Sequence, residues 1–257
     1  MNIKVIVATH KPYRMPTDSM YMPMHVGRAL SDSWQNTELS TYAGDDTCEN
    51  ISSKNKNYCE LTALYWAWKN LDYDYLGLAH YRRYFKGSEE KDKWQSILAK
   101  ESAQQLLAEY DVILPKKRNY FIETTYDQYV HAHNQQDLDK TLEIIKEFYP
   151  EYVPAWDKVM KSTSGHRFNM FIMKKEIMNS YLEWIFDILF KLENVLDISN
   201  YSVNDRRVFG FVSERLLDVW LITNNINYTE LPVINMENQN WPKKIFNFLK
   251  RKFVGKR

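Results

Sequence analysis

The stretch from Tyr73 to Phe85 places the tightest constraint on how this chain can fold. Tyr75 to Ala79 is a short apolar and aromatic run, which suits a buried strand and is too short for a helix. The run ends abruptly in His80, Arg82 and Arg83. Ligands of open α/β sheets bind just beyond the carboxyl ends of the strands, so the two arginines would face an anionic ligand there. The alternative is a solvated arginine pair at a strand end.

Length and composition indicate one large domain, or a domain with an appendage, whose aromatic residues suit both a core and flat ligands. The chain has 257 residues, enough for a substantial core, and its formal net charge of +1 argues against a nucleic-acid-binding protein. Aromatic residues reach 15%, and their polar tips and apolar faces suit sugars or bases. The seven glycines form neither a Rossmann fingerprint nor a P-loop. Cys48 and Cys59 lack metal-binding spacing, which fits a reducing cytoplasm, and we expect no signal peptide and no membrane span.

The N-terminal segment is typical of a nucleotide-binding α/β domain. Ile3 to Ala8 is predicted to form the first strand, and Thr9, His10 and Lys11 follow it as small polar and basic groups. We expect these three residues to contact a donor nucleotide. Further along, Asp45 and Asp46 follow a glycine in a segment with turn chemistry, and we interpret them as a solvated turn rather than metal ligands.

A helix is predicted from about Tyr58 to Asn70, because apolar residues recur there at helical spacing. Asn57 followed by Glu60 resembles a capping box. The polar cluster at residues 52–57 lies at the N-terminus of this helix, where free backbone N–H groups favour an anion. We expect the pyrophosphate of a ligand here, with an ordinary polar loop as the alternative.

The middle of the chain supplies a second basic and aromatic segment. Ile97 to Glu109 is predicted to be an amphipathic helix, and Tyr110 to Leu114 a buried strand. The strand is followed by the basic and aromatic residues 116–120. Two strands that end in such segments indicate a shared binding edge.

Two candidate metal motifs have simpler interpretations. Asp137 and Asp139 mimic an Asp-x-Asp motif, but they open a periodic run and are predicted to be acids of a first helical turn. His131 and His133 could join another histidine in a metal site, whereas ordinary polar positions are the more common case.

The second half of the sequence supplies further candidates. Asn169 is a polar residue inside a strand predicted from Phe168 to Met173, so its amide must be hydrogen-bonded or serve a ligand. A long helix is predicted from Glu176 to Leu196, and helical spacing over residues 204–221 puts Glu214 on one face with Arg207. Glu214 is then either a catalytic base or a partner in an ion pair.

Five motifs, at residues 50–70, 75–85, 111–120, 166–174 and 207–216, resemble those of a bacterial glycosyltransferase family. This is the capsular and exopolysaccharide family long catalogued as a domain of unknown function, and the most specific motif is Tyr-Leu-Gly-Leu-Ala-His-Tyr-Arg-Arg-Tyr-Phe. The resemblance runs from about Ile3 to Pro232. It implies a GT-A-like α/β nucleotide-diphospho-sugar transferase fold over residues 1–240, with a mixed central sheet flanked by helices. Common GT-A enzymes end the central strand in Asp-x-Asp, whereas this chain has His80 to Arg83, so we expect no divalent metal and no other cofactor.

The resemblance implies transfer of a sugar from a UDP-linked donor to a lipid-linked saccharide in capsular or exopolysaccharide synthesis, and galactofuranosyl transfer is associated with some relatives. The rival hypothesis is a non-catalytic saccharide-binding or scaffold subunit. We assign charge stabilisation of the departing diphosphate to Arg82 and Arg83, and the role of base to Glu214 with Asp205 behind it. Expected donor contacts are Thr9, His10, Lys11, Lys54, Asn55, Asn57, His80 and Lys117, and expected acceptor contacts are His166, Asn169 and Arg207.

The C-terminal segment 241–257 is basic and contains no acidic residue. On a helix its apolar residues Ile245, Phe246, Leu249 and Phe253 would share one stripe. Such a segment can lie in the interface of an anionic membrane. We therefore expect a cytoplasmic protein held at the inner face of the plasma membrane, with a disordered basic terminus as the alternative.

Overall fold

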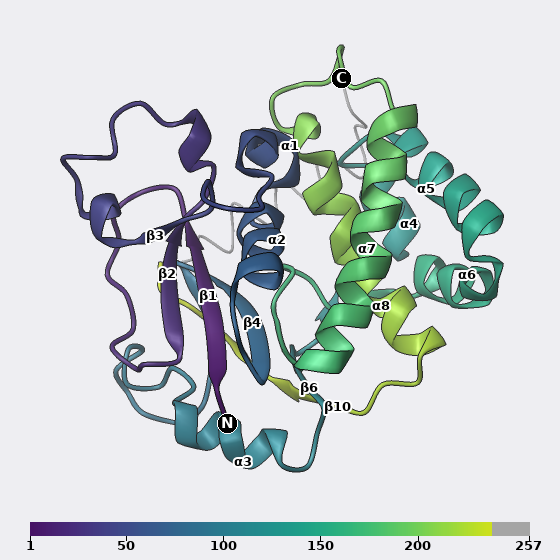
Figure 1. Cartoon of the computed structure of the whole chain (residues 1–257). Coiled ribbons are helices and arrows are strands. Elements are labelled where there is room, and N and C mark those ends of the chain that lie inside the picture. The colour runs from purple at the N-terminus through teal and green to yellow at the C-terminus, as the bar shows by residue number, and fades with distance from the viewer. Residues whose placement is uncertain (238–257) are drawn as a thin grey trace.

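The computed structural model describes residues 1–237, and in this part of the chain nine strands form one mixed sheet (Figure 1). The order of neighbouring strands is β10-β6-β9-β4-β1-β2-β3, and β5 links β4 to β11. The strands are β1 Ile3–Thr9, β2 Tyr21–His25, β3 Ala43–Gly44, β4 Tyr75–His80, β5 Arg83–Phe85, β6 Val112–Pro115, β9 Phe171–Lys174, β10 Tyr228–Leu231 and β11 Val233–Asn235. A separate two-stranded sheet joins β7 Arg118–Asn119 to β8 Ser164–Gly165.

The two strands that the sequence predicts most strongly, β1 and β4, are present and lie side by side near the middle of the sheet. They run parallel, with Ile3 opposite Tyr75. Both are almost continuously apolar, as expected of strands that are covered on both faces. Gly77 is required in β4, because a Cβ there would lie 2.8 Å from the carbonyl oxygen of Phe171 in β9.

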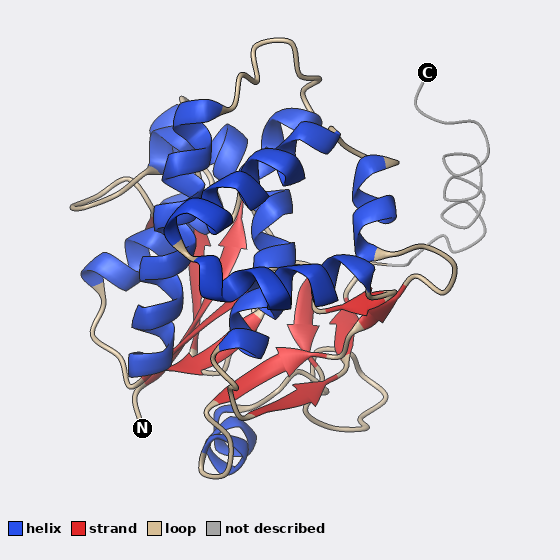
Figure 2. Ribbon diagram, turned by 90° about the vertical axis from the view of Figure 1, so that its right-hand side faces the viewer, coloured by secondary structure: helices blue, strands red, loops and turns tan. Residues whose placement is uncertain are grey.

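Helices cover one face of the sheet, and a single short helix lies on the other (Figure 2). The helices are α1 Asn55–Tyr58, α2 Leu61–Asn70, α3 Lys100–Leu107, α4 Thr125–Val130, α5 Gln135–Phe148, α6 Val153–Lys161, α7 Lys175–Val195 and α8 Val208–Thr223. Short 3-10 turns are η1 Arg28–Leu30, η2 Glu38–Thr41, η3 Ser52–Lys54, η4 Pro150–Tyr152 and η5 Asp205–Arg207. Alternate residues of β1 divide the core: Ile6 packs towards α2, α7 and α8, whereas Val5 and Val7 pack towards α3.

Two predicted elements have different boundaries because their backbones turn sharply. The helix predicted from Tyr58 to Asn70 is divided into α1 and α2 at Cys59, which has a φ of 54°. Asn57 therefore lies inside α1, and the expected capping box does not form. The strand predicted from Phe168 begins only at Phe171, because Phe168 and Asn169 have φ values of 80° and 50°, which no strand residue adopts.

The interpretation of Asp45 as a residue of a solvated turn is wrong. Its carboxylate is fully buried and accepts four hydrogen bonds. Two come from the backbone N–H groups of Gly27 (2.8 Å) and Arg28 (3.1 Å), and two from the hydroxyls of Ser52 (2.5 Å) and Thr62 (2.6 Å). Asp45 thus ties the segment after β2, which shows no periodicity in the sequence, to the first turn of α2.

Asp137 does lie in the first turn of α5, as predicted, where it accepts hydrogen bonds from Tyr129 (2.8 Å) and Tyr201 (2.6 Å). His131 and His133 contact Glu123 and Asp205 separately. Within residues 1–237 no three histidine, cysteine or carboxylate side chains come together as metal ligands would.

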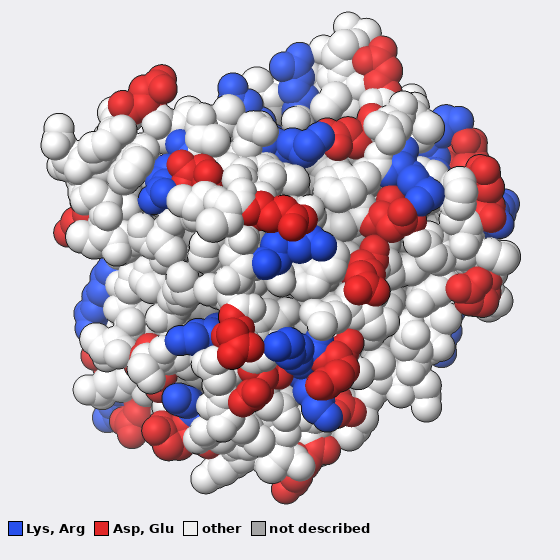
Figure 3. All heavy atoms as spheres, viewed as in Figure 1, with Lys and Arg blue, Asp and Glu red and all other residues white. Residues whose placement is uncertain are grey.

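No helix in the described part of the chain is long and apolar enough to cross a bilayer. Basic and acidic side chains are interspersed over the face shown in Figure 3, in keeping with the small net charge. The predicted boundary at residue 240 and the amphipathic segment 241–257 lie outside the described residues.

Candidate active site

The carboxyl ends of β1, β4 and β6 lie at one edge of the sheet. β1 runs parallel to β4, and both β4 and β6 run antiparallel to β9, which lies between them. The two basic and aromatic segments, which follow β4 and β6, therefore share an edge, as the sequence predicts. His10, which follows β1, lies at this edge as well and contacts the Tyr81 ring.

Arg83 is the most exceptional side chain at this edge. Its guanidinium is half-buried and lies 4.6 Å above the Phe168 ring, yet it forms no ion pair or side-chain hydrogen bond with any residue that the structure describes. Burial lowers the pKa of Arg83, and Arg82 adds to this effect, whereas the carboxylates of Glu214 and Glu60 oppose it. A guanidinium held out of water with five free donors is a site for an anion.

Three further basic side chains surround the same edge. Arg82, in the turn between β4 and β5, lies over the Tyr81 ring and pairs with Glu237 at 3.0 Å. Burial lowers the pKa of His10, and the charges of Lys11, Arg82 and Arg207 lower it further, so the imidazole is neutral at pH 7. Arg82, after β4, and Arg207, before α8, are far apart in sequence, yet the charges of both act on His10. Both arginines therefore belong to the same edge of the sheet.

A strained loop before β9 supports this cluster. Phe168 and Asn169 are two successive non-glycine residues with left-handed backbone conformations, which cost roughly 1–2 kcal/mol each. The carbonyl oxygen of Phe168 accepts a hydrogen bond from Nε2 of His80, which holds the loop against the end of β4. The loop places the Phe168 ring under Arg83 and turns the Asn169 amide inward.

Asn169 holds the carboxylate of Glu60, which is not among the predicted site residues. Its Nδ2 donates to Oε1 of Glu60 at 2.7 Å and to the carbonyl of Gly210 at 3.1 Å, while its Oδ1 accepts from Ser213 at 3.0 Å. The Asn169 amide is thus satisfied within the protein, and Oε2 of Glu60 has no hydrogen-bond partner among the described residues. Glu60 precedes α2, and its spacing from Asn57 predicts half of a capping box. The positive φ of Cys59, which cannot be read from the sequence, turns the Glu60 side chain towards Asn169 and away from a capping position.

Glu214 lies in α8 and also faces the cluster. One of its oxygens accepts from the buried Arg215 at 3.0 Å, and its charge acts on both Arg83 and Arg207. Arg207 in turn donates from Nε to the Cys59 thiol at 3.2 Å. Burial raises the pKa of Cys59 to about 12, so this sulfur remains a thiol. The edge therefore offers two carboxylates beside three arginines.

The other residues that are predicted to contact the sugar donor already have partners within the protein. The Lys54 ammonium pairs with Glu193 of α7 at 2.6 Å. Asn55 donates to Cys59 and Thr62, and Asn57 donates to the carbonyl of Arg206 at 2.8 Å. The Thr9 hydroxyl donates to the carbonyl of Lys11 at 2.6 Å, and the Lys11 ammonium lies over the rings of Tyr13 and Tyr81.

Three more predicted site residues have other contacts or line another cavity. His166 is fully buried, and its two ring nitrogens contact Asp218 and Glu230. Asp205 accepts from the Ser202 hydroxyl at 2.8 Å in the turn before α8. Lys117 lines a separate pocket beyond β6.

Comparison with known proteins agrees with this architecture. Among solved structures the chain is similar to the apo structure of the WbbM bifunctional glycosyltransferase, with a TM-score of 0.83 and 33% sequence identity. The similarity covers 93% of this chain and 46% of that one, so the chain spans about half the length of WbbM. No curated protein matches the sequence. The mixed sheet flanked by helices is thus a GT-A-like α/β fold, as expected. The family model described as "Domain of unknown function (DUF4422)" matches residues 4–225, and the chain belongs to that family.

Proposed function

We propose that the protein is a glycosyltransferase that moves a sugar from a nucleotide-diphospho-sugar to a hydroxyl of a saccharide. The similarity to WbbM supports the reaction class. The observation that carries the proposal is Arg83, a half-buried guanidinium without a described ionic partner at the carboxyl edge of the sheet. A buried charge is costly when unpaired, and the diphosphate of a donor would offset that cost.

In the proposed reaction the acceptor oxygen bonds to the anomeric carbon while the bond from that carbon to the diphosphate breaks. Arg83, with Arg82 and Arg207, stabilises the negative charge that develops on the leaving group. If the configuration inverts, a carboxylate takes the proton of the acceptor hydroxyl. Glu214 and Glu60 are the candidates for this base, because both act electrostatically on Arg83.

We further propose that these arginines stabilise the charge of the leaving diphosphate, a role that a divalent metal has in other GT-A enzymes. Turnover should then survive chelation with EDTA. Loss of turnover on chelation that manganese or magnesium restores would contradict this part of the proposal and would direct attention to carboxylates and histidines instead.

The finer features of the proposal come from the sequence motifs. They are a UDP-linked donor, with UDP-galactofuranose among the candidates, and a lipid-linked acceptor in capsular or exopolysaccharide synthesis. They also include attachment to the inner face of the plasma membrane through the segment 241–257. A thermal-shift screen of nucleotide sugars tests the donor, because a ligand that binds the folded state raises the melting temperature.

The decisive experiment measures nucleoside diphosphate release, with and without a saccharide acceptor, for the parent protein and Arg83→Ala. Loss of the guanidinium should raise the barrier by about 2–4 kcal/mol and weaken nucleotide binding. Arg14→Ala is a matched control, because that guanidinium also lies over an aromatic ring, Trp94, at 4.4 Å. Nucleotide binding without acceptor-dependent release in the parent protein would favour the rival, a non-catalytic saccharide-binding subunit.

A further inference from the structure

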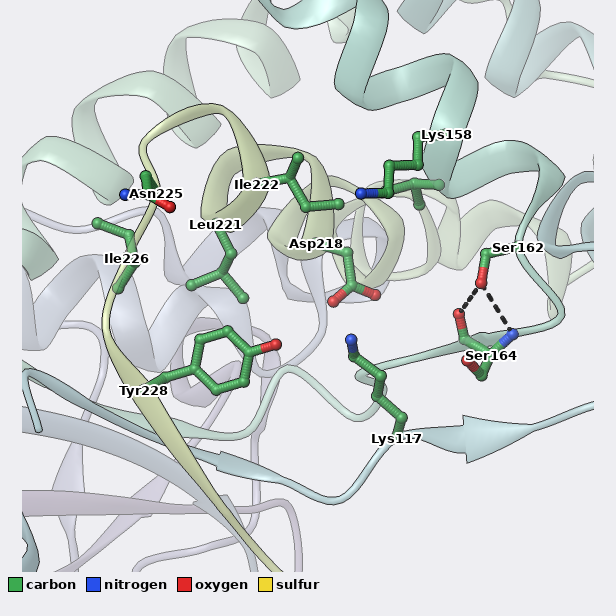
Figure 4. A pocket seen from close by; sticks show the side chains of 11 residues that line it. Lys117, Lys158, Ser162, Ser164, Asp218, Leu221, Ile222, Asn225, Ile226 and Tyr228 are labelled. Carbon is green, nitrogen blue, oxygen red and sulfur yellow. Dashed lines mark hydrogen bonds between the residues drawn. The ribbon is translucent and has the colours of Figure 1, made fainter.

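A pocket of about 450 Å³ lies beyond the end of β6, between the sheet and the helices α6 and α8 (Figure 4). Such a volume is within the usual range of small-ligand sites, about 300–1,000 Å³. Lys117 follows β6, Tyr228 begins β10, and Lys158 belongs to α6. Apart from Lys117, which is a predicted donor contact, the residues that line this pocket have no part in the proposed chemistry.

The pocket has a cationic side. Figure 4 shows the Lys117 and Lys158 ammonium groups directed into it. Within residues 1–237 neither ammonium has an ion-pair or hydrogen-bond partner. Asp218 is the acid of the lining, but its two oxygens are engaged by the buried side chains of His166 and Arg167. The lysines therefore remain available to an external anion.

The opposite side is suited to the carbon skeleton of a sugar. Leu221, Ile222, Val159 and Ile226 supply apolar surface, and Tyr228 adds an aromatic ring with its hydroxyl. Ile222 is 41% exposed, which leaves apolar surface at the mouth of the pocket. The pocket therefore offers apolar surface beside its polar groups, and small-molecule sites combine the two in the same way.

The wall of the pocket is joined to the candidate active site. Asp218 and Arg167 lie 3.4 Å apart, and Arg167 in turn donates to the carbonyl oxygen of Glu214 at 3.4 Å. Lys117 is followed directly by Arg118, whose charge acts on Arg83. The pocket and the candidate active site are thus linked through buried residues of one shared wall.

We propose that this pocket binds an anionic sugar unit of the acceptor, one that carries a carboxylate or a phosphate. Lys117 and Lys158 hold the anionic group, and the apolar wall and Tyr228 pack against the ring. The assignment to the acceptor rests on the proposed transferase function, whereas binding of an anionic sugar does not.

The test is direct binding of glucuronate and of glucose 1-phosphate, with glucose as the neutral control, measured by calorimetry or ligand-observed NMR. Lys117→Ala and Lys158→Ala should each weaken the binding of the anionic sugars roughly tenfold. This factor corresponds to one lost charge-assisted contact of about 1.4 kcal/mol. Lys161→Ala, at the exposed C-terminal end of α6, is the matched control and should change nothing. Ile222→Asp should also weaken the binding of both ligands, because its carboxylate repels them. The variant should still fold, because this position is exposed.

Binding of one anionic sugar alone, with dependence on both lysines, supports the proposal and identifies the anionic group. Glucose binding as tightly as glucuronate would overturn it, and so would unchanged affinities in the lysine variants. Loss of glucose 1-phosphate binding in Arg83→Ala, but not in Lys117→Ala, would place that ligand at the arginine cluster and also overturn it. Diphosphate release is measured separately, so lysine-dependent binding without release would refute only the transferase function.

Discussion

At the scale of the residue, two glutamates compete for the role of the base. Glu60 is aligned by Asn169 and keeps one carboxylate oxygen without a described partner, whereas Glu214 shares an oxygen with the buried Arg215. We expect Glu60→Gln or Glu214→Gln, whichever removes the base, to lower turnover by about 10²–10⁴ while donor affinity persists. The other variant should show nearly normal turnover and a lower melting temperature, as the loss of a structural contact predicts. Equal, small losses in both would mean that neither is the base.

His25 gives a prediction for the pH dependence of stability. It is buried at the end of β2, and its Nδ1 has no hydrogen-bond partner among the described residues. Burial lowers the pKa of His25 below its usual 6.5, although Asp45 opposes the shift. The unfolded chain therefore takes up a proton first as the pH falls. The free energy of unfolding should decrease from pH 7 through 6.5 and below, and urea titrations of His25→Asn should show a shallower decrease than the parent. An equal slope in both would show that His25 does not contribute.

At the scale of the element, the segment between β2 and α2 depends on one buried carboxylate. In Asp45→Asn an amide group replaces one oxygen, so the backbone N–H of either Gly27 or Arg28 faces another donor. Hydroxyls can rotate to adapt, but backbone N–H groups cannot. A buried donor without a partner costs about 1–3 kcal/mol, and we expect a loss of that size in denaturant unfolding.

Asp46→Asn is the matched control, because the neighbouring carboxylate is partly exposed and pairs with Arg28 at 2.6 Å. Pairs of this kind contribute about 0–1 kcal/mol. Similar losses in both variants would show that burial of Asp45 is not what holds the segment.

For the whole molecule, we predict that the segment 241–257 serves membrane attachment and not catalysis. Its basic residues should each contribute about 1 kcal/mol near an anionic surface. Deletion of residues 242–257 should abolish salt-sensitive binding to anionic liposomes, since that charge is removed. Turnover on a soluble acceptor should be unchanged. A truncated protein that binds liposomes as well as the full chain does would exclude this segment as the anchor.

The central strands and the long helices of this protein can be predicted from its sequence. The apolar runs of β1 and β4 can only be buried strands, and helical periodicity is long enough in α5, α7 and α8 to identify them. Arginines after β4 indicate the functional edge for the same local reason: charge follows directly on a buried strand.

Tertiary structure alone decided which polar groups work together. Asp45 resembles a turn residue until four donors 7 to 18 residues away surround its carboxylate. Glu60 resembles a helix cap until the turn at Cys59 directs it towards Asn169. Left-handed backbone at Phe168 has no local sequence signal, because an aromatic residue adopts it only where surrounding contacts offset the strain. Periodicity indicates which face of an element is buried, whereas side-chain partners between 7 and 109 residues apart are determined by packing.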